Sequence, residues 1–356
     1  MSEKLLTLII PSYNMEALLP KCLGSLVGEE MNGDWRQGLE VLVVNDGSKD
    51  RTSEIAHDFE LRYQEVVKVI DKPNGHYGSC VNAGLKAASG VWVKMLDADD
   101  YFDSAVLAEY MGLLQELYEK GETPDLVLTE FQSEDPEGKV RKYYGKWGYP
   151  VGRTFDMEEF NRHHFDLFMH SLTYRTEMLR AIDYRQFEGI MYTDLQWAFK
   201  PMAAVGSARY FPKVLYHYLV GREGQSVDPK VHAKTIWMRK KILMAAAQDY
   251  AGLCASVPAA NQTYLKYWMD VCFLNLYNAC IFENPCDESD KDLAEVDELL
   301  KTAAPEIYEK LGELEISRRL RFRYVRAWRR SKSSRSLAFR LFNAYQRLVG
   351  MIRRVR

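Results

Sequence analysis

Short apolar runs alternate with helical patterns over the first 131 residues, and this alternation restricts the possible folds more than any other feature of the chain. The runs that read as strands are 5–10, 39–44, 66–70, 91–96 and 125–131. Segments with helical spacing lie between them, near 15–27, 51–64, 78–88 and 104–119. Strands that are apolar on both faces and separated by helices predict an α/β fold, with a mostly parallel central sheet and helices on both faces.

The pattern changes after residue 141. Aromatic residues gather at 143–155, and the segment "MEEFNRHHFDLFMHSLTYRTEMLRAI" (157–182) predicts a long helical stretch. Residues 230–316 are helical in pattern, and a basic tail follows them. We therefore expect three parts: an α/β domain (1–228), a helical accessory region (229–316) and a basic amphipathic tail (317–356).

Three short polar motifs follow predicted strands. "PSYN" comes after the first strand, "NDGS" after the second and "DADD" after the fourth. Ligands in parallel α/β sheets bind beyond the carboxyl ends of the strands. The three motifs should therefore meet in one crevice.

The sequence "LDADDYFD" crowds four carboxylates where a buried strand ends: Asp97, Asp99, Asp100 and Asp103. Neighbouring carboxylates resist ionising together. Asp103 is explained as the N-cap of the next helix, and a solvated loop would be the simplest account of the others. Asp97 and Asp99 could instead hold one hard cation, Mn or Mg, because such ions take carboxylate and phosphate oxygens.

Two common nucleotide-binding loops are missing from the sequence. A dinucleotide-binding fold would carry GxGxxG after its first strand, and a P-loop enzyme would carry GxxxxGK[ST]. The first turn here reads "IPSYNMEA", and neither pattern occurs in the chain. A cation held by the acids would supply the counter-charge that such a loop gives to phosphates.

Five motifs occur in order along residues 4–227: "IPSYN", "VVNDGSKDRT", "NGHYGSCVNAGLKAASG", "LDADD" and "YTDLQW". This series resembles that of the family 2 glycosyltransferases of the bacterial cell-surface polysaccharide type. These are inverting enzymes that use nucleotide-diphosphate sugars. The resemblance implies a GT-A fold, which is a Rossmann-like α/β fold, here followed by a helical C-terminal region.

The same resemblance implies a nucleotide-sugar pocket. Asp46 matches the family's base-binding acid, and Asn45 stands where the family usually has another acid. An Asx-turn with a purely structural role remains open for Asp46. The other positions implied to line the nucleotide and sugar are Pro11, Ser12, Tyr13, Asn74, Gly75 and Asn82.

The remaining motifs carry the chemistry in this resemblance. Asp97 and Asp99 match the pair that holds metal and donor, and Asp194 of "YTDLQW" matches the catalytic base. Asp194 could also simply cap the helix that follows it. Arg222 in "YLVGREGQSVD" is implied to contact the diphosphate, and His217 to complete the site as a metal or phosphate ligand.

The tail has a charge unlike that of the rest of the chain. It holds 14 Lys and Arg from Ser317 onward and no acid, whereas the preceding residues carry 33 basic and 50 acidic side chains. Apolar residues recur within it at near-helical spacing: Leu337, Leu341, Tyr345, Leu348 and Ile352. A basic amphipathic helix suits an anionic membrane surface. Docking on the acidic body is the second hypothesis, and nucleic-acid binding is the least favoured.

Together these observations predict an inverting glycosyltransferase with a divalent cation, Mn or Mg. It would move a sugar from a nucleotide-diphosphate sugar, expected to be a UDP-sugar, to a hydroxyl of a saccharide or lipid-linked acceptor. The six cysteines form no CxxC pair and fit reduced thiols in the cytoplasm, with the protein held at the inner face of the membrane. A nucleotidyltransferase and a non-catalytic nucleotide-sugar-binding scaffold are the alternatives.

Overall fold

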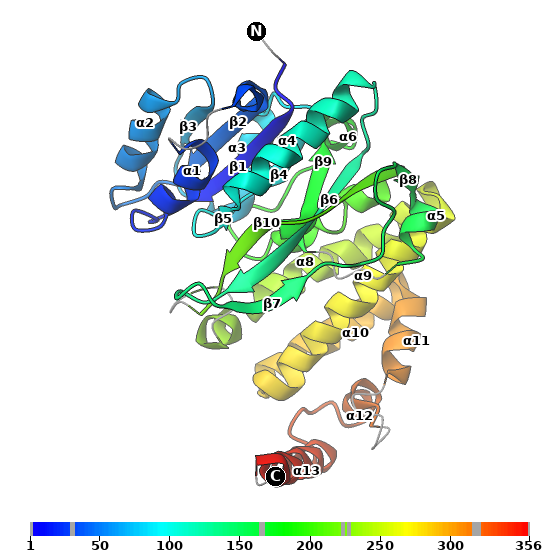
Figure 1. Ribbon diagram of the computed structural model, residues 1–356. Helices are drawn as coiled ribbons and strands as arrows, with labels where there is room; N and C mark the ends of the chain where they lie inside the picture. The colour runs from blue at the N-terminus through cyan, green and yellow to red at the C-terminus, as the bar shows by residue number, and fades with distance from the viewer. Residues whose placement is uncertain are drawn as a thin grey trace. The chain divides into compact units, whose positions relative to one another are not determined.

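The structure of the protein is a computed structural model, shown in Figure 1. It describes residues 3–28, 33–163, 168–221, 225, 229–314 and 322–354. The chain divides into two compact units, residues 1–228 and residues 229–356. The acidic motifs that the sequence singles out all lie in the first unit.

A ten-stranded sheet forms the centre of the first unit. Its strands are β1 (Leu6–Ser12), β2 (Leu39–Asn45), β3 (Val67–Asp71), β4 (Trp92–Met95), β5 (Tyr101–Phe102), β6 (Leu126–Glu134), β7 (Val140–Tyr144), β8 (Phe155–Asp156), β9 (Leu172–Arg175) and β10 (Ser207–Leu219). Their order is β3-β2-β1-β4-β9-β6-β10-β5, with β7 beside β6 and β8 beside β10. The pairs β1–β2, β1–β4, β2–β3 and β6–β10 are parallel. The predicted α/β class and its five strands are confirmed.

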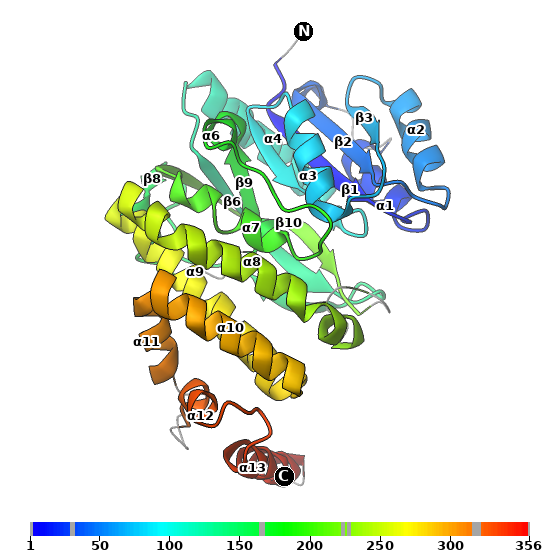
Figure 2. The same cartoon turned by 180° about the vertical axis from the view of Figure 1, so that it is seen from behind.

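Helices cover both faces of this sheet (Figures 1 and 2). On one face α1 (Leu19–Val27) and α4 (Ser104–Glu119) pack over the apolar side chains of β1, β2 and β4 and form the main core. On the other face lies α3 (His76–Ala87), while α2 (Thr52–Arg62) packs beside β3. Asp103 caps α4, since its carboxylate accepts a hydrogen bond from the amide of Val106 at 2.9 Å. The predicted N-cap is confirmed.

The long helix predicted over 157–182 is wrong. The described part of this segment holds a short helix α5 (Met157–Phe160), a 3-10 turn (Met169–Ser171), strand β9 and helix α6 (Thr176–Ala181). β9 inserts between β4 and β6 and is antiparallel to both. The side chains of Thr173 and Tyr174 are fully buried there. Burial within the sheet therefore outweighed the local helical spacing.

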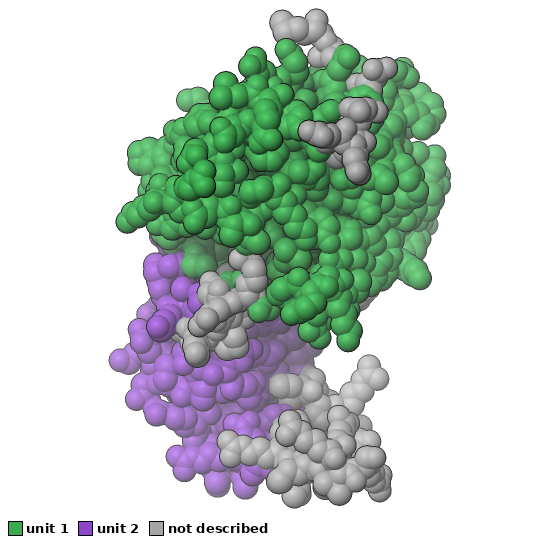
Figure 3. All heavy atoms as spheres, turned by 60° about the vertical axis from the view of Figure 1, so that its left-hand side comes forward, with its two compact units in different colours: residues 1–228 green, residues 229–356 purple. Residues whose placement is uncertain are grey.

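The second unit, purple in Figure 3, is helical. Its helices are α8 (Pro229–Ser256), α9 (Ala259–Asn278), α10 (Asp287–Ala303), α11 (Pro305–Glu313), α12 (Tyr324–Ser331) and α13 (Leu337–Arg354), with a π-helical turn after α9 (Ala279–Glu283). Across the described helices of the chain, none combines the length and apolar character needed to cross a bilayer. The predicted boundary at residue 316 falls outside the described residues and stays a prediction.

Part of the basic tail packs on its acidic neighbours within this unit. The indole of Trp328 is buried and donates to Asp290 Oδ1 at 2.7 Å. The guanidinium of Arg329 pairs with Asp297 at 2.9 Å and lies 3.5 Å from the ring centre of Tyr308. Helix α12 therefore docks on α10 and α11. This arrangement supports the docking hypothesis for α12.

Candidate active site

The carboxyl ends of β1 and β2 meet in one rim, which brings together two of the three motifs. Ser12 pairs with Asn45 in the register of the two strands, and the amide of Asp46 donates to the carbonyl of Ser12 at 2.9 Å. Beyond the strands, the loops after β1 and β2 are joined by a hydrogen bond, in which the backbone amide of Asn14 donates to Ser48 Oγ at 3.1 Å. "PSYN" and "NDGS" thus form a single polar edge.

Within this edge the predicted residues differ in what they present to solvent. Tyr13 is 41% exposed, and Pro11 is half-buried. Ser12 is buried, and its hydroxyl donates to the carbonyl of Ile10 at 3.2 Å. Ser12 therefore shapes the strand end from inside the protein.

Asp46 is a buried carboxylate that fixes the neighbouring loop. Its Oδ1 accepts from Lys72 Nζ at 2.5 Å and from the amide of Gly75 at 2.9 Å. The side chain of Asn74 donates to the carbonyl of Asp46 at 3.0 Å. The structure thus brings Asp46, Asn74 and Gly75 together. It adds Lys72, which the sequence reasoning missed because no pattern links a lysine to an acid 26 positions away.

Asn45, which stands where the family usually has an acid, uses its side-chain amide to bind a carboxylate. Its amide donates to Asp71 Oδ1 at 2.6 Å, and its own Oδ1 accepts from the amide of Ser48 at 3.2 Å. The hydrogen bond from the Asn45 amide is the main cause that lowers the pKa of Asp71. An ionised acid at position 45 would face the Asp71 carboxylate, so the amide suits this site.

Asn82 anchors the segment that leads to the predicted base. Its side chain donates to the carbonyl of Gln186 and accepts from the amide of the same residue, both at 2.9 Å. The amide of Phe187 in turn donates to Gln196 Oε1 at 2.8 Å. Gln196 belongs to α7 (Asp194–Trp197), whose first residue is Asp194. Asn82 therefore positions the helix of the predicted base, through a chain of hydrogen bonds.

The acids of "LDADD" gather beside a buried imidazole. Ligand atoms of Asp97, Asp100 and His170 all lie within 4.8 Å of one another. The Nδ1 of His170 is buried and lacks a hydrogen-bond partner. Two carboxylates and an imidazole with a vacant nitrogen fit a divalent cation such as Mn, since such ions accept oxygen and imidazole ligands.

The buried environment disfavours the charged forms of Asp97, Asp100 and His170. Burial raises the pKa of Asp97 to about 6; the hydrogen bond from the Tyr77 hydroxyl at 2.9 Å opposes that rise, and the negative charge of Asp194 adds to it. Burial, and then the charge of Asp97, raises the pKa of Asp100 well above its usual value. Burial lowers the pKa of His170 to about 3, with help from the charge of Lys94, so the ring is neutral. Asp194 is thus close enough to act on Asp97 electrostatically.

Asp100 is the most constrained of these acids. Its Oδ2 accepts from the hydroxyl of Tyr216 at 2.6 Å, and its Oδ1 accepts from the amide of Leu219 at 2.8 Å. Asp99 is half-buried and lies outside the three-residue group. The sequence reasoning named Asp99 and missed Asp100 and His170 as possible ligands.

His217 lies outside the group of Asp97, Asp100 and His170, and its predicted role as a metal or phosphate ligand stays a prediction. Neighbouring side chains of a strand point to opposite faces, and Tyr216 points to Asp100. The His217 ring instead lies with its Nδ1 2.7 Å from Glu134 and stacks on Tyr101, with centroids 4.7 Å apart. Arg222 lies outside the described residues, so its predicted contact stays a prediction.

Comparison with known proteins finds glycosyltransferases, in agreement with the family resemblance of the motifs. Residues 7–183 match the family model "Glycosyl transferase family 2". A segment of 102 residues is 37% identical to the "Uncharacterized glycosyltransferase EpsJ" of Bacillus subtilis (strain 168), covering 29% of this chain and 28% of that protein. The chain is 25% identical to the poly(ribitol-phosphate) beta-glucosyltransferase of Bacillus spizizenii, over 63% of this chain and 33% of that one. The matches span 28%, 32% and 47% of the first three curated relatives.

Among solved structures, the fold resembles that of S. aureus TarS 1-349 in complex with UDP-GlcNAc. The TM-score is 0.63 at 17% identity, and the match covers 93% of this chain and 88% of that chain. The same fragment in complex with UDP gives a TM-score of 0.62 at 18% identity. At this identity the likeness establishes the fold, which is the predicted GT-A arrangement.

Proposed function

The chain belongs to the family 2 glycosyltransferases, and from that premise we propose that it is an inverting enzyme of bacterial cell-surface polysaccharide synthesis. It moves a sugar from a nucleotide-diphosphate sugar to a hydroxyl of a saccharide or lipid-linked acceptor. The observation that carries this proposal is the acidic group at the end of β4, with Asp97 electrostatically coupled to Asp194. The solved structures that share the fold bind UDP and UDP-GlcNAc, which makes a UDP-sugar the first donor to test.

The donor pocket in this proposal is the rim formed by β1, β2 and α3. Tyr13 is exposed at its edge and can stack on a flat pyrimidine ring. Asp46 would receive hydrogen bonds from the base once Lys72 shifts towards the diphosphate. Asn74 and Gly75 are held against Asp46 and would form the floor beside the ribose. Arg222 stays the predicted diphosphate contact.

A divalent cation, Mn or Mg, completes this site in the proposal. Asp97 is the shared ligand, with Asp99 as its partner in the family resemblance and with Asp100 and His170 as partners in the observed geometry. When bound, such an ion stabilises the negative charge of a departing diphosphate. Asp97 and Asp99 are both partly exposed and can reach a substrate, whereas Asp100 and His170 lie behind them.

The chain's own groups perform the proton transfer. Asp194 would accept the proton of the attacking acceptor hydroxyl as its oxygen bonds to the anomeric carbon. The bond between that carbon and the diphosphate oxygen breaks in the same step, so the electron pair leaves with the diphosphate. Attack opposite the leaving group inverts the configuration, and an α-linked donor yields a β-linkage. Asn82 and Gln196 keep the base in place through the segment at Phe187.

Thermal unfolding with UDP, GDP or dTDP, each with and without Mn, tests the donor site without an acceptor. A ligand that binds only the folded state adds RT ln(1 + [L]/Kd), which is about 2.7 kcal/mol at a hundredfold excess over Kd. We expect a cation-dependent increase with UDP in the wild-type protein, and its loss in Asp97→Asn. Equal unfolding temperatures with all three nucleotides would contradict the proposed donor pocket.

Two matched variants identify the other cation ligands. Loss of the UDP–Mn shift in Asp99→Asn, with retention in His170→Gln, assigns the cation to the Asp97–Asp99 pair. The reverse pattern assigns it to the group with the buried imidazole. Turnover that disappears in Asp194→Asn while the shift remains separates an enzyme from a nucleotide-sugar-binding scaffold. Release of pyrophosphate from a nucleoside triphosphate would instead indicate a nucleotidyltransferase.

We also propose that α13 holds the protein on the cytoplasmic face of the membrane. Two of the predicted apolar residues, Leu337 and Leu341, are 71% and 62% exposed, while Phe339 and Phe342 are buried. The side chains of Leu348 and Ile352 lie outside the described residues. Exposed leucines one turn apart beside arginines support contact with an anionic lipid surface. Nucleic-acid binding has no support of this kind.

A further inference from the structure

An arginine of β10 is mostly buried and forms no ion pair with any residue that the structure describes. The side chain of Arg209 is only 7% exposed, and its Nε is buried with no hydrogen-bond partner. Across the described chain, none of the hydrogen bonds or ion pairs includes its guanidinium. Nε alone of the guanidinium nitrogens is among the buried unpartnered atoms, so the other two reach solvent at the hollow and are accessible to an anion.

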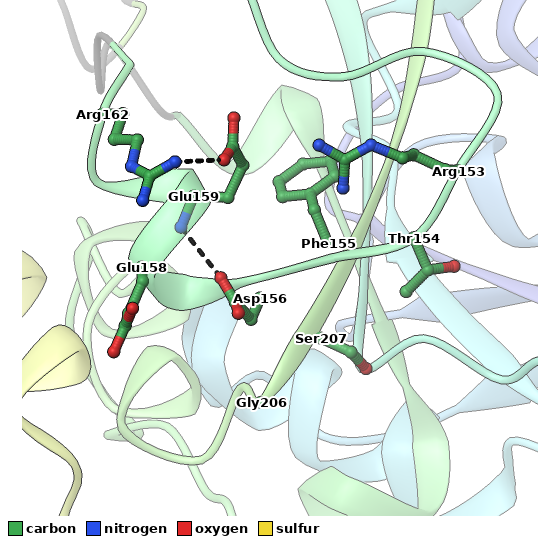
Figure 4. Close-up of a pocket in the computed structure, with 9 residues that line it drawn as sticks. All are labelled: Arg153, Thr154, Phe155, Asp156, Glu158, Glu159, Arg162, Gly206 and Ser207. Atoms are coloured by element: carbon green, nitrogen blue, oxygen red, sulfur yellow. Dashed lines mark hydrogen bonds and ion pairs between the residues drawn. The ribbon is translucent and has the colours of Figure 1, made fainter.

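The Arg209 side chain borders an open cavity of about 480 Å³, which Gly152, Arg153, Thr154 and Ser207 also line. An adjoining cavity of about 440 Å³ shares Arg153, Thr154 and Ser207, and Figure 4 shows this second cavity. In that view Arg153 extends from the segment that leads into β8, on the opposite side of the cavity from Arg162. We call the 480 Å³ hollow the Arg153–Arg209 cavity.

The walls of this cavity are set by paired backbone. β8 runs antiparallel to the start of β10, with Ser207 opposite Asp156 and Ala208 opposite Phe155. Arg209 follows the paired residues in β10, and Thr154 directly precedes β8. The strand pairing therefore fixes the backbone from which the Arg209 side chain reaches the hollow.

The neighbouring acids are mostly committed to other partners. Asp125 accepts from the amide of Gly206 at 2.9 Å and pairs with Arg175 at 2.7 Å. Glu116 lies close enough for the charge of Arg209 to contribute to lowering its pKa, but Lys120 is the main cause and binds the carboxylate directly.

The residues that line the 480 Å³ hollow include two arginines and one acid. The acid is Glu122, and its Oε2 accepts a hydrogen bond from the hydroxyl of Thr154 at 3.1 Å. Arg153 and Arg209 line the same hollow. The hollow therefore carries a net positive charge.

We propose that the Arg153–Arg209 cavity binds a phosphate group at a site separate from the nucleotide pocket. Guanidinium groups bind phosphate oxygens through paired charge-assisted hydrogen bonds. The cavity lies where β6 and β10 begin, whereas the candidate active site lies where β1, β2 and β4 end. A phosphorylated small molecule and a phosphodiester polymer share the required chemistry.

Calorimetric titration of the full chain with inorganic phosphate, in EDTA, tests this site. We expect one saturable site in the wild-type protein and a Kd at least tenfold higher in Arg209→Met and in Arg153→Met. Arg162→Met is the matched control, because Arg162 lines the adjoining hollow and is already paired with Glu159 at 2.8 Å. Methionine of similar length should fold, since replacing a buried charge by an apolar group is often neutral or stabilising.

Equal phosphate affinity in the wild-type protein and both cavity variants would overturn the proposal. Loss of phosphate binding in Asp97→Asn would do so too, because it would place the ion at the nucleotide site. The UDP–Mn shift should persist in Arg209→Met, so failure here is distinguishable from failure of the proposed function. A glycerol-phosphate oligomer that binds as tightly as phosphate identifies a polymer ligand, and binding of the monoester alone identifies a small molecule. Both results support the site.

Discussion

Replacing Asp97 by Asn should stabilise the cation-free protein while it removes donor binding. Burial raises the pKa of Asp97 from its ordinary 3.8 to about 6, so the folded protein holds this proton more tightly than the unfolded chain. Stability contributed by the protonated acid is present at low pH and is lost as pH rises through the folded pKa. At pH 7.5 the wild-type protein therefore carries an unfavourable buried charge that an amide lacks.

The expected size follows from the shift. A difference of about 2 pKa units corresponds to about 3 kcal/mol, at about 1.4 kcal/mol for each unit. Asp97 keeps some exposure, and solvent screening reduces the effect, so we expect a gain of about 1–3 kcal/mol. The hydrogen bond from the Tyr77 hydroxyl can be kept, because the amide oxygen of Asn also accepts.

Urea unfolding in EDTA at pH 4, 5, 6, 7 and 8 measures this difference. The free energy of unfolding of Asp97→Asn relative to wild type should rise between pH 4 and pH 7 and then level off. Asp194→Asn should shift the midpoint of that rise to lower pH, because the charge of Asp194 contributes to raising the pKa of Asp97. A difference that stays constant from pH 4 to pH 8 would refute the reasoning.

Three further predictions follow from the same structure. Asp194→Asn should lower the rate of UDP release from the donor by a factor of about 10²–10⁴ and leave the UDP–Mn unfolding shift unchanged, and equal rates would exclude it as the base. Lys94 is fully buried, and burial lowers its pKa from 10.5 to about 7. The wild-type free energy of unfolding should therefore fall as pH drops from 9.5 to 7, and Lys94→Met should flatten this slope in urea titrations. Leu337→Gln with Leu341→Gln should weaken flotation with anionic vesicles by about 100-fold, given roughly 1.5–3 kcal/mol for each buried leucine; unchanged flotation would exclude α13 as the anchor.

The sequence predicts the site best where the polar residues directly follow a strand in the chain. β1, β2 and β4 are short apolar runs, so their ends could be located from the sequence. Strands of a parallel sheet place their carboxyl ends at one edge. Asp46 therefore lies beside Ser12, with its amide 2.9 Å from the Ser12 carbonyl, although 33 residues separate them.

Contacts between segments far apart in the chain could not be predicted from the ends of the strands. Lys72 reaches Asp46 only because the turn after β3 folds over the end of β2. His170 reaches Asp97 only because β9 is inserted beside β4, and its segment was predicted as a helix. The face that His217 takes depends on the register of β10, which contains irregularities at Val214. A shift of one residue moves a side chain to the other face of a sheet.

The acids at the end of β4 are arranged at a cost to the folded protein. Burial raises the pKa of both Asp97 and Asp100; the charge of Asp194 adds to the rise at Asp97, and the charge of Asp97 adds to the rise at Asp100. Lys94, in β4 itself, does not neutralise them, because its amine donates to the carbonyl of His170 at 2.7 Å and to Thr129 at 3.3 Å. A cation with a bound diphosphate would remove this repulsion and could therefore bind more tightly than exposed carboxylates allow. The same reasoning applies with the sign reversed to Arg209, whose largely buried side chain has an unpartnered Nε and would be stabilised by an anion.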